Sequence, residues 1–205
     1  MICIVEYGSG NVGALANLLK RRRIPFFISG NSSEMAKADR FILPGVGAFD
    51  PTMEQLLQSG ILAALEQEVV GKGKAVLGIC VGMHLLAEGS EEGTRPGLGW
   101  VPGYVRKIDA SKRNRPPLLP HMGWNSLLPQ MEHPLLNGID CDRGFYYLHS
   151  YFFDASDDEH VMARVRYGDE LPCAVTRGNV FGVQFHPEKS HENGERLLQN
   201  FAELA

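Results

Sequence analysis

A cysteine, a histidine and a glutamate occur in patterns that favour nucleophilic chemistry. Cys80 ends an apolar, strand-like run and is flanked by Gly78 and Gly82. Glycines at these two positions allow the chain to turn sharply from a strand into a helix, which exposes the side chain between them above the sheet. A helix N-terminus there favours a thiolate, and its free backbone N–H groups can hold an oxyanion. The pattern predicts a nucleophilic thiol at Cys80.

The candidate base is His186, which is followed by Pro187 and Glu188. Proline disfavours the helical conformation in the residue before it, and residues two apart in an extended segment project on the same side. Glu188 is therefore placed to bind one ring nitrogen while the other takes the thiol proton. Taken alone, the cysteine also fits a small core residue and the His-Pro-Glu segment a loop corner. Together they predict a thioester-forming triad.

Composition restricts the setting of this chemistry. A chain of 205 residues with 44% hydrophobic residues suggests a single domain over 1–205. The net charge of -4 offers no basic surface for nucleic acid. The four cysteines are scattered without Cys-x-x-Cys spacing, so we expect reduced thiols. The N-terminus enters a strand pattern directly and no apolar run has membrane length, so we expect a cytoplasmic protein with no membrane partner.

Apolar runs alternate with helical patterns in the first half of the chain. Strands are expected at 2–5, 26–28, 41–43 and in the apolar run that ends at Cys80, with helices at 12–19, from 33, and between 51 and 70. This order implies right-handed crossovers and a parallel sheet covered on both faces. Further strands are expected at 100–108, 145–148, 161–165, 173–176 and 180–185, and a last helix at 194–204. Sites in such sheets form at the carboxyl ends of strands, where 8–11, 44–47 and Cys80 fall.

Several of these motifs resemble a known family. Gly-Ile-Cys-Val-Gly at 78–82 with Phe-His-Pro-Glu at 185–188 resembles the class I, triad-type glutamine amidotransferases. Four finer motifs resemble the glutaminase subunits of imidazole glycerol phosphate synthases. These motifs are Pro-Gly-Val-Gly at 44–47, Pro-His-Met-Gly-Trp-Asn at 120–125, His-Ser-Tyr at 149–151 and Gln-Phe-His-Pro-Glu-Lys-Ser at 184–190. The resemblance runs from the first strand to the last helix. It implies an α/β three-layer sandwich with a mostly parallel, flavodoxin-like central sheet.

The resemblance also implies an activity and a set of site residues. Glutamine would be hydrolysed to glutamate and ammonia through a glutamyl thioester on Cys80, with no cofactor and no metal ion. The expected oxyanion donors are backbone N–H groups of Gly45, Val46 and Val81. In the glycine-rich segment 44–47, a peptide plane can rotate toward or away from the oxyanion at low energetic cost. The expected substrate-binding residues are Gly47, His84, Glu92, His149, Ser150 and Tyr151. Without the resemblance, Glu92 fits an exposed loop carboxylate.

A partner is implied because ammonia at neutral pH is mostly ammonium, which is not a nucleophile. In the family, the partner is a (β/α)₈ cyclase that forms a heterodimer with the glutaminase. The ammonia is then used to make imidazole glycerol phosphate and aminoimidazole carboxamide ribotide in histidine biosynthesis. The resemblance places four residues at this interface: Asn11, Trp124, Tyr146 and Lys189. Taken singly, an aromatic such as Trp124 more often belongs to a core.

His84 departs from the family pattern, which has glutamine at this position. Because it lies one helical turn after Cys80, we expect it near the substrate, with extra titration near the ordinary imidazole pKa of about 6.5. The alternative is that His84 only packs the helix against the sheet. Other features resemble a paralogous branch that supplies ammonia for amidating surface-polysaccharide sugars. A non-catalytic scaffold of a cyclase, and a thiol hydrolase acting on its own substrate, are the remaining alternatives.

Overall fold

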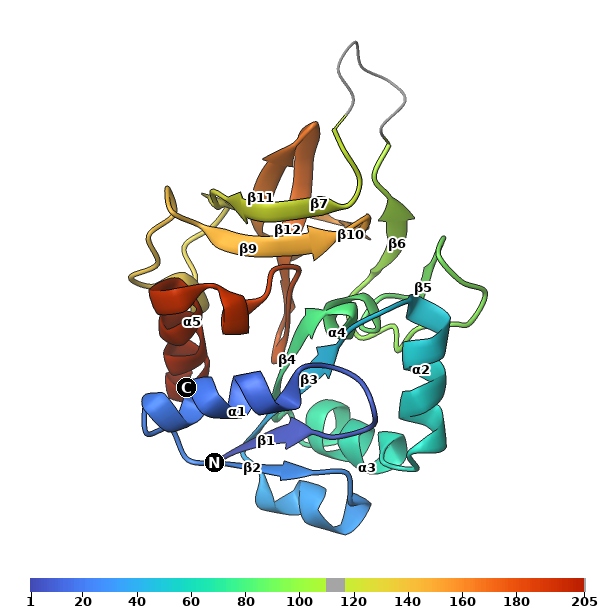
Figure 1. The fold of residues 1–205 in the computed structure, drawn as a ribbon. Coiled ribbons are helices and arrows are strands. Elements are labelled where there is room, and N and C mark those ends of the chain that lie inside the picture. The colour runs from blue at the N-terminus through green and yellow to red at the C-terminus, as the bar shows by residue number, and fades with distance from the viewer. Residues whose placement is uncertain (110–116, 205) are drawn as a thin grey trace.

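An eight-stranded sheet forms the centre of the computed structural model, which describes residues 1–109 and 117–204 (Figure 1). Its strand order is β2-β1-β3-β4-β13-β12-β11-β8. In that order the bounds are Phe26–Ser29, Ile2–Val5, Arg40–Gly45, Ala75–Cys80, Val180–Val183, Asp169–Arg177, Val161–Tyr167 and Leu128–Pro129. Strands from β2 to β13 pair in parallel, and those from β13 to β8 pair antiparallel.

Two small sheets lie beyond the carboxyl end of β4 (Figure 1). One has the order β10-β6-β5, with bounds Tyr151–Ala155, Gly103–Lys107 and Gly89–Ser90. The other pairs β7, His121–Asn125, with β9, Phe145–His149. His149, Ser150 and Tyr151, at the ends of β9 and β10, line the same pocket as Cys80.

Helices cover the central sheet and complete the three layers expected from the alternating pattern. Their bounds are Val12–Arg21 for α1, Phe49–Gln58 for α2, Leu62–Glu66 for α3, Val81–His84 for α4 and His191–Glu203 for α5. Four 3₁₀ turns lie at Ser32–Lys37 (η1), Pro134–Leu136 (η3), Asp158–His160 (η4) and Pro187–Lys189 (η5), and a π turn lies at Gln67–Gly71 (η2). α1 packs on α5, where Arg21 and Arg22 form ion pairs of 3.2 and 2.8 Å with Glu195.

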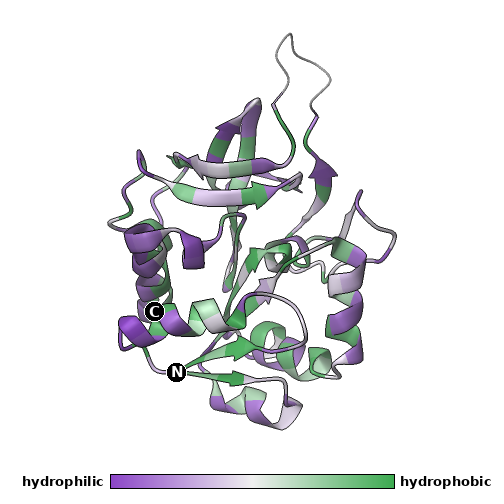
Figure 2. Cartoon of the chain, viewed as in Figure 1, coloured by the Kyte–Doolittle hydropathy of each residue, from purple (hydrophilic) through white to green (hydrophobic). Residues whose placement is uncertain are grey.

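The parallel strands form the core because helices remove both of their faces from water. Ile4, Leu43 and Leu77 on three neighbouring strands are fully buried. Figure 2 shows hydrophobic residues concentrated in these strands and hydrophilic residues on the surrounding helices and loops. Within the described residues, no helix combines the length and the apolar character needed to cross a membrane.

The structure corrects the sequence-based elements mainly at their ends. The helix expected from residue 33 is a 3₁₀ turn, the strand expected over 180–185 ends at Val183, and α5 begins at His191 rather than at residue 194. Only 103–107 of the strand expected at 100–108 is regular. Four strands were not expected: β5, β7, β8 and β10. β5 is buried but has only two residues, and the other three are short and only partly buried, so none of them has a strong apolar period.

Candidate active site

Cys80 occupies a strained turn between β4 and α4. Its backbone has φ 54° and ψ −113°, which is unusual for a residue with a side chain. The flanking glycines make this turn possible. A Cβ on Gly82 would lie 1.9 Å from the carbonyl oxygen of Leu43, and one on Gly78 would lie 2.6 Å from the carbonyl oxygen of Gly82. The predicted elbow is therefore present, although α4 after it is a single turn and too short for the dipole of a long helix.

His186 and Glu188 meet close to this turn. His186 Nδ1 lies 2.9 Å from Glu188 Oε1, and both side chains are buried. His186 is extended, with φ −103° and ψ 96°, as expected before a proline. Glu188 does not continue an extended segment, however, because Pro187–Lys189 forms a 3₁₀ turn. The turn, rather than strand alternation, brings the carboxylate back to the imidazole.

The environment of His186 favours its protonated form. Burial by itself would lower the pKa of the imidazole, but the neighbouring Cys80 thiol and the Glu188 carboxylate outweigh burial and raise this pKa above its ordinary value. The other ring nitrogen, His186 Nε2, is buried and makes no hydrogen bond within the described part of the chain. It is therefore free to exchange a proton with the thiol, and such contacts commonly tighten when a substrate is bound.

Cys80 and His186 open onto a pocket of about 320 Å³, which is large enough for an amino acid. Its lining includes eight of the nine residues expected to hold the oxyanion or the substrate: Val46, Gly47, Val81, His84, Glu92, His149, Ser150 and Tyr151. Gly45 is the exception. It pairs with Cys80 across β3 and β4, and a Cβ on it would lie 2.4 Å from Gly82 N, so it packs beneath the turn.

The oxyanion segment adopts a conformation in which one expected donor is already used. The Val46 N–H donates to Ser9 Oγ at 3.0 Å. The Val46 carbonyl oxygen also accepts hydrogen bonds, from Ser9 Oγ at 3.1 Å and from Thr52 Oγ1 at 3.3 Å. Gly47 next to it has φ 98°, a conformation that favours glycine. In this state the Val46 N–H is not available to an oxyanion at Cys80.

Glu92 is half-buried in the pocket wall and is not an exposed loop carboxylate. Its Oε2 accepts a hydrogen bond of 2.9 Å from the backbone N–H of Phe49, the first residue of α2. Burial raises the pKa of Glu92, and the bond from Phe49 partly opposes that rise. The carboxylate thus joins the substrate pocket to the helix that follows the oxyanion segment.

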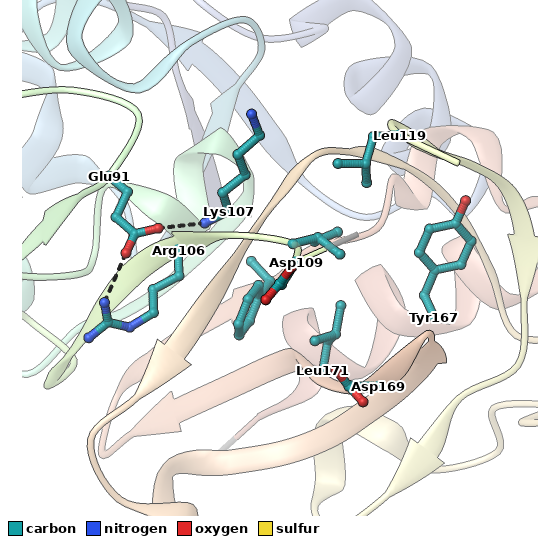
Figure 3. A pocket seen from close by; sticks show the side chains of 10 residues that line it. Glu91, Arg106, Lys107, Asp109, Leu119, Tyr167, Asp169 and Leu171 are labelled. Atoms are coloured by element: carbon teal, nitrogen blue, oxygen red, sulfur yellow. Dashed lines mark hydrogen bonds and ion pairs between the residues drawn. The ribbon is translucent and has the colours of Figure 1, made fainter. Parts of the chain in front are cut away.

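A larger hollow of about 670 Å³ lies beside β6 and β10 (Figure 3). Its lining contains no cysteine, serine, threonine or histidine among the described residues. Glu91 at its edge binds the backbone N–H of Lys107 and Arg106 Nη1, each at 3.0 Å. These bonds anchor the segment that carries Glu92. The hollow therefore supports the position of Glu92 but lacks the triad chemistry.

His84 lines the pocket, but it is bonded to a protein side chain. Its Nε2 lies 2.7 Å from Gln184 Oε1, and both residues are buried. Burial lowers the pKa of His84 to about 4, and the bond to Gln184 only partly opposes this shift. The titration expected near 6.5 is therefore wrong, because desolvation moves it below the physiological range.

A chain of hydrogen bonds fixes the imidazole of His149. Its Nδ1 lies 2.8 Å from the carbonyl oxygen of Tyr151, which can only accept, so Nδ1 carries the proton. His149 Nε2 then accepts from His121 Nδ1 at 3.0 Å, and Asn125 Nδ2 lies 3.3 Å from His121 Nε2. Burial lowers the pKa of His149 to about 3 and that of His121 to about 4. Both rings are neutral and hold the Ser150–Tyr151 segment in place.

Three of the residues expected at a partner interface lie together. Trp124 pairs with Tyr146 across β7 and β9, and Lys189 Nζ lies 5.3 Å from the centre of the Tyr146 ring. Trp124 is 42% exposed and stacks on His191, so it is not a core aromatic. Asn11 caps α1 by accepting from the N–H of Ala14, and α1 contacts the turn that carries Lys189.

Sequence reasoning missed three residues that contact the site residues. Ser9, His121 and Gln184 each bond a pocket residue from another part of the chain. His121 and Gln184 fall inside the motifs at 120–125 and 184–190, which is the signal that could have singled them out. Ser9 lies in the Gly-Ser-Gly segment at 8–10, at the carboxyl end of β1.

Comparisons with known proteins agree with this geometry. The family model described as "Glutamine amidotransferase class-I" matches residues 3–204. The "Imidazole glycerol phosphate synthase subunit HisH" of Bdellovibrio bacteriovorus is 50% identical over 208 residues, and the protein of the same name from Leptospira interrogans is 45% identical over 204. Both alignments cover 100% of each chain. The solved "Structure of PurLQS from Thermotoga maritima" shares the fold, with a TM-score of 0.72 at 20% identity over 98% of this chain and 96% of that one. The chain therefore belongs to the class-I glutamine amidotransferase family, among the HisH subunits of imidazole glycerol phosphate synthase.

Proposed function

We propose that this chain releases ammonia from glutamine through a thioester on Cys80, with His186 as base and acid and Glu188 as its orienting partner. As a HisH-type class-I glutamine amidotransferase, the chain is the glutaminase subunit of imidazole glycerol phosphate synthase in histidine biosynthesis. The observation that carries the proposed roles is the convergence of Cys80 with the bonded pair of His186 and Glu188 at one pocket.

The proposed reaction has two halves. The Cys80 thiolate attacks the side-chain carbonyl carbon of glutamine, and the electron pair moves to an oxygen held by the N–H of Val81. His186 passes the former thiol proton to the nitrogen as ammonia leaves. Water, deprotonated by His186, then attacks the thioester carbon, glutamate departs and the thiolate returns. The Glu188 carboxylate stabilises the imidazolium in both halves.

The substrate is proposed to lie with its α-ammonium at Glu92. The second carboxylate oxygen of Glu92 is not engaged by Phe49, and half-burial strengthens a charged contact there. Gly47 and the segment Ser150–Tyr151 supply backbone groups along the same wall. His84 lines the pocket as well, with its ring held by the 2.7 Å bond to Gln184.

The partner is proposed to be a (β/α)₈ cyclase that forms a heterodimer with this chain. Trp124 and Met122 project from the same face of β7 and are 42% and 62% exposed, which supports their burial by another protein. The Lys189 ammonium lies over the Tyr146 ring and adds a positive charge and an aromatic ring to this surface. The cyclase would use the ammonia to form imidazole glycerol phosphate and aminoimidazole carboxamide ribotide. Direct transfer avoids loss of the nucleophile as ammonium.

The test is to assay Cys80→Ala in complex with the cyclase, using either glutamine or ammonium salt as nitrogen source. Glutamine-dependent synthesis should be abolished, while synthesis from ammonia stays within about twofold because the acceptor site lies on the partner. Cys141→Ala, at a half-buried cysteine outside the pocket, should retain both activities. Glutamine-dependent synthesis that survives in Cys80→Ala would overturn the proposed nucleophile.

The same assay separates the remaining alternatives. Glutamate release should be slow in the isolated chain and rise by about 10²–10³ with the liganded cyclase, the typical effect of one oxyanion donor. Equal rates with and without the cyclase would contradict this regulation. A paralogous glutaminase for sugar amidation would show the same thioester chemistry without stimulation by the cyclase, and a scaffold would release no glutamate at all.

A further inference from the structure

Gln184 lies directly beside the sulfur of Cys80. It follows the last residue of β13, the strand adjacent to β4, and its side chain is fully buried. Its Nε2 is 3.9 Å from Cys80 Sγ, and its Oε1 is 2.7 Å from His84 Nε2. The amide thus connects the nucleophile with the histidine one helical turn after it.

The proton positions in this chain follow from the donor and acceptor types. An amide oxygen can only accept, so His84 Nε2 carries a proton and donates it to Gln184 Oε1. Burial keeps the imidazole neutral, and His84 Nδ1 has no partner within the described residues. The reverse amide orientation would place the oxygen of Gln184 against the sulfur, where two electron-rich atoms repel each other. The amide N–H therefore faces Cys80.

We propose that Gln184 donates a hydrogen bond to the Cys80 thiolate, and that His84 is the positioning residue that fixes the amide for this task. The inference rests on the proposed role of Cys80 as nucleophile. A donor aimed at sulfur stabilises the anion more than the thiol, so it increases the thiolate fraction at neutral pH. At position 84 the family pattern has glutamine, whose side chain also carries N–H groups. His84 therefore keeps an N–H donor to the amide of Gln184 at this position.

Other ionisable groups also influence the thiolate, so the role of Gln184 must be measured as a difference between variants. His186 faces Cys80 from the segment after β13, with Glu188 behind it. His84 on α4, together with His149, Tyr151 and Glu92 from the small sheets and their connections, lines the same pocket. All of these remain in place when only Gln184 is changed.

The experiment measures the rate at which iodoacetamide alkylates Cys80 from pH 5 to 10 in the isolated full chain, with the Cys80 peptide quantified by mass spectrometry. Gln184→Met keeps the length of the side chain and removes the donor. Its alkylation profile should move to higher pH by roughly one unit, the effect of one hydrogen bond to an anion. His133→Met, a half-buried histidine at the opposite end of the sheet, should leave the profile unchanged.

Variants of His84 test the positioning role. His84→Leu should shift the profile in the same direction by a smaller amount, and His84→Gln should restore it. In the Gln184→Met background, His84→Leu should add no further shift, since its effect passes through the amide. If the alkylation profile of the double variant shifts further than that of Gln184→Met alone, His84 acts independently of Gln184, and the positioning role is overturned.

An unchanged profile in a folded Gln184→Met variant would overturn the donor role, with Gln184→Leu as the second variant if the first fails to fold. Circular dichroism and the urea midpoint establish folding. Failure of this inference is distinct from failure of the proposed function. The former leaves glutamine-dependent synthesis dependent on Cys80, whereas the latter appears as synthesis that survives Cys80→Ala.

Discussion

At the scale of single residues, Glu92 combines two roles that the sequence does not connect. One carboxylate oxygen holds the N–H of Phe49 at the start of α2, and the side chain lines the pocket beside Cys80. A neutral glutamine can still accept the bond from Phe49 through its amide oxygen, but it cannot pair with an ammonium group. The two roles are therefore separable by one isosteric substitution.

We expect Glu92→Gln to raise the KM for glutamine about 10- to 100-fold with a smaller change in kcat. The reason is that a hydrogen bond to a charged group is worth ~1.5–3 kcal/mol, and this contact is present before the transition state. Glu66→Gln is the matched control, because Glu66 is an exposed carboxylate on α3 and does not line the pocket. Steady-state glutaminase kinetics with the cyclase present measure both. An unchanged KM for glutamine in Glu92→Gln would contradict the proposed contact between the Glu92 carboxylate and the α-ammonium group of the substrate.

At the scale of elements, two loops meet because the strands before them are neighbours. β1 pairs in parallel with β3, so the loop at 8–11 and the segment 44–47 leave the sheet at the same edge. Ser9 then reaches Val46 and holds both its N–H and its carbonyl oxygen. Under the proposed function, the bonded Val46 peptide corresponds to a resting state with an incomplete oxyanion hole.

Ser9→Ala should raise the glutaminase rate of the isolated chain about two- to tenfold. Removal of one neutral hydrogen bond, worth ~0.5–1.5 kcal/mol, makes rotation of the Val46 peptide easier. The rate with the liganded cyclase should change less, because the peptide has already turned in that state. Ser33→Ala, on the exposed 3₁₀ turn at Ser32–Lys37, is the control. A basal rate that stays equal or falls would show that Ser9 does not hold the resting state.

At the scale of the whole molecule, the site is built around neutral buried imidazoles. Burial lowers the pKa of His84 and His121 to about 4 and that of His149 to about 3. The unfolded chain, with imidazoles near 6.5, binds more protons than the folded chain between these values. The stability from these residues is therefore complete above pH 6.5 and is lost as pH falls toward the folded pKa values.

The free energy of unfolding should consequently fall between pH 6.5 and 4, and His121→Gln should reduce this slope by about one proton, or roughly 1.4 kcal/mol per pH unit. Urea unfolding at half-unit pH intervals measures the slope separately from any uniform loss of stability. Asn17→Gln, at an exposed position with no titratable side chain, should leave the slope as in the wild type. An unchanged slope in His121→Gln would mean that His121 is not held neutral in the folded chain.

The sequence by itself determined the parts that depend on local pattern. Gly78 and Gly82 around Cys80 define a turn that only small neighbours allow, and the structure has it. The strand expected at 2–5 agrees with β1 and the strand expected to end at Cys80 agrees with β4, because strands buried on both faces are continuously apolar. The strands that the sequence did not predict, such as β7 and β10, are short and partly exposed, so their sequences show little periodic pattern of apolar residues.

Only the tertiary structure decided how the polar groups of the site are paired. Ser9 and Val46 are 37 positions apart, His121 and His149 are 28 apart, and His84 and Gln184 are 100 apart. Each pairing depends on which strands are neighbours and on which side chains lose contact with water. A buried polar group must find a partner inside the fold, and local spacing does not specify which one. For this reason the meeting of Cys80, His186 and Glu188 could be predicted from residue types, whereas the neutral state of His84 and the bonded state of Val46 could not.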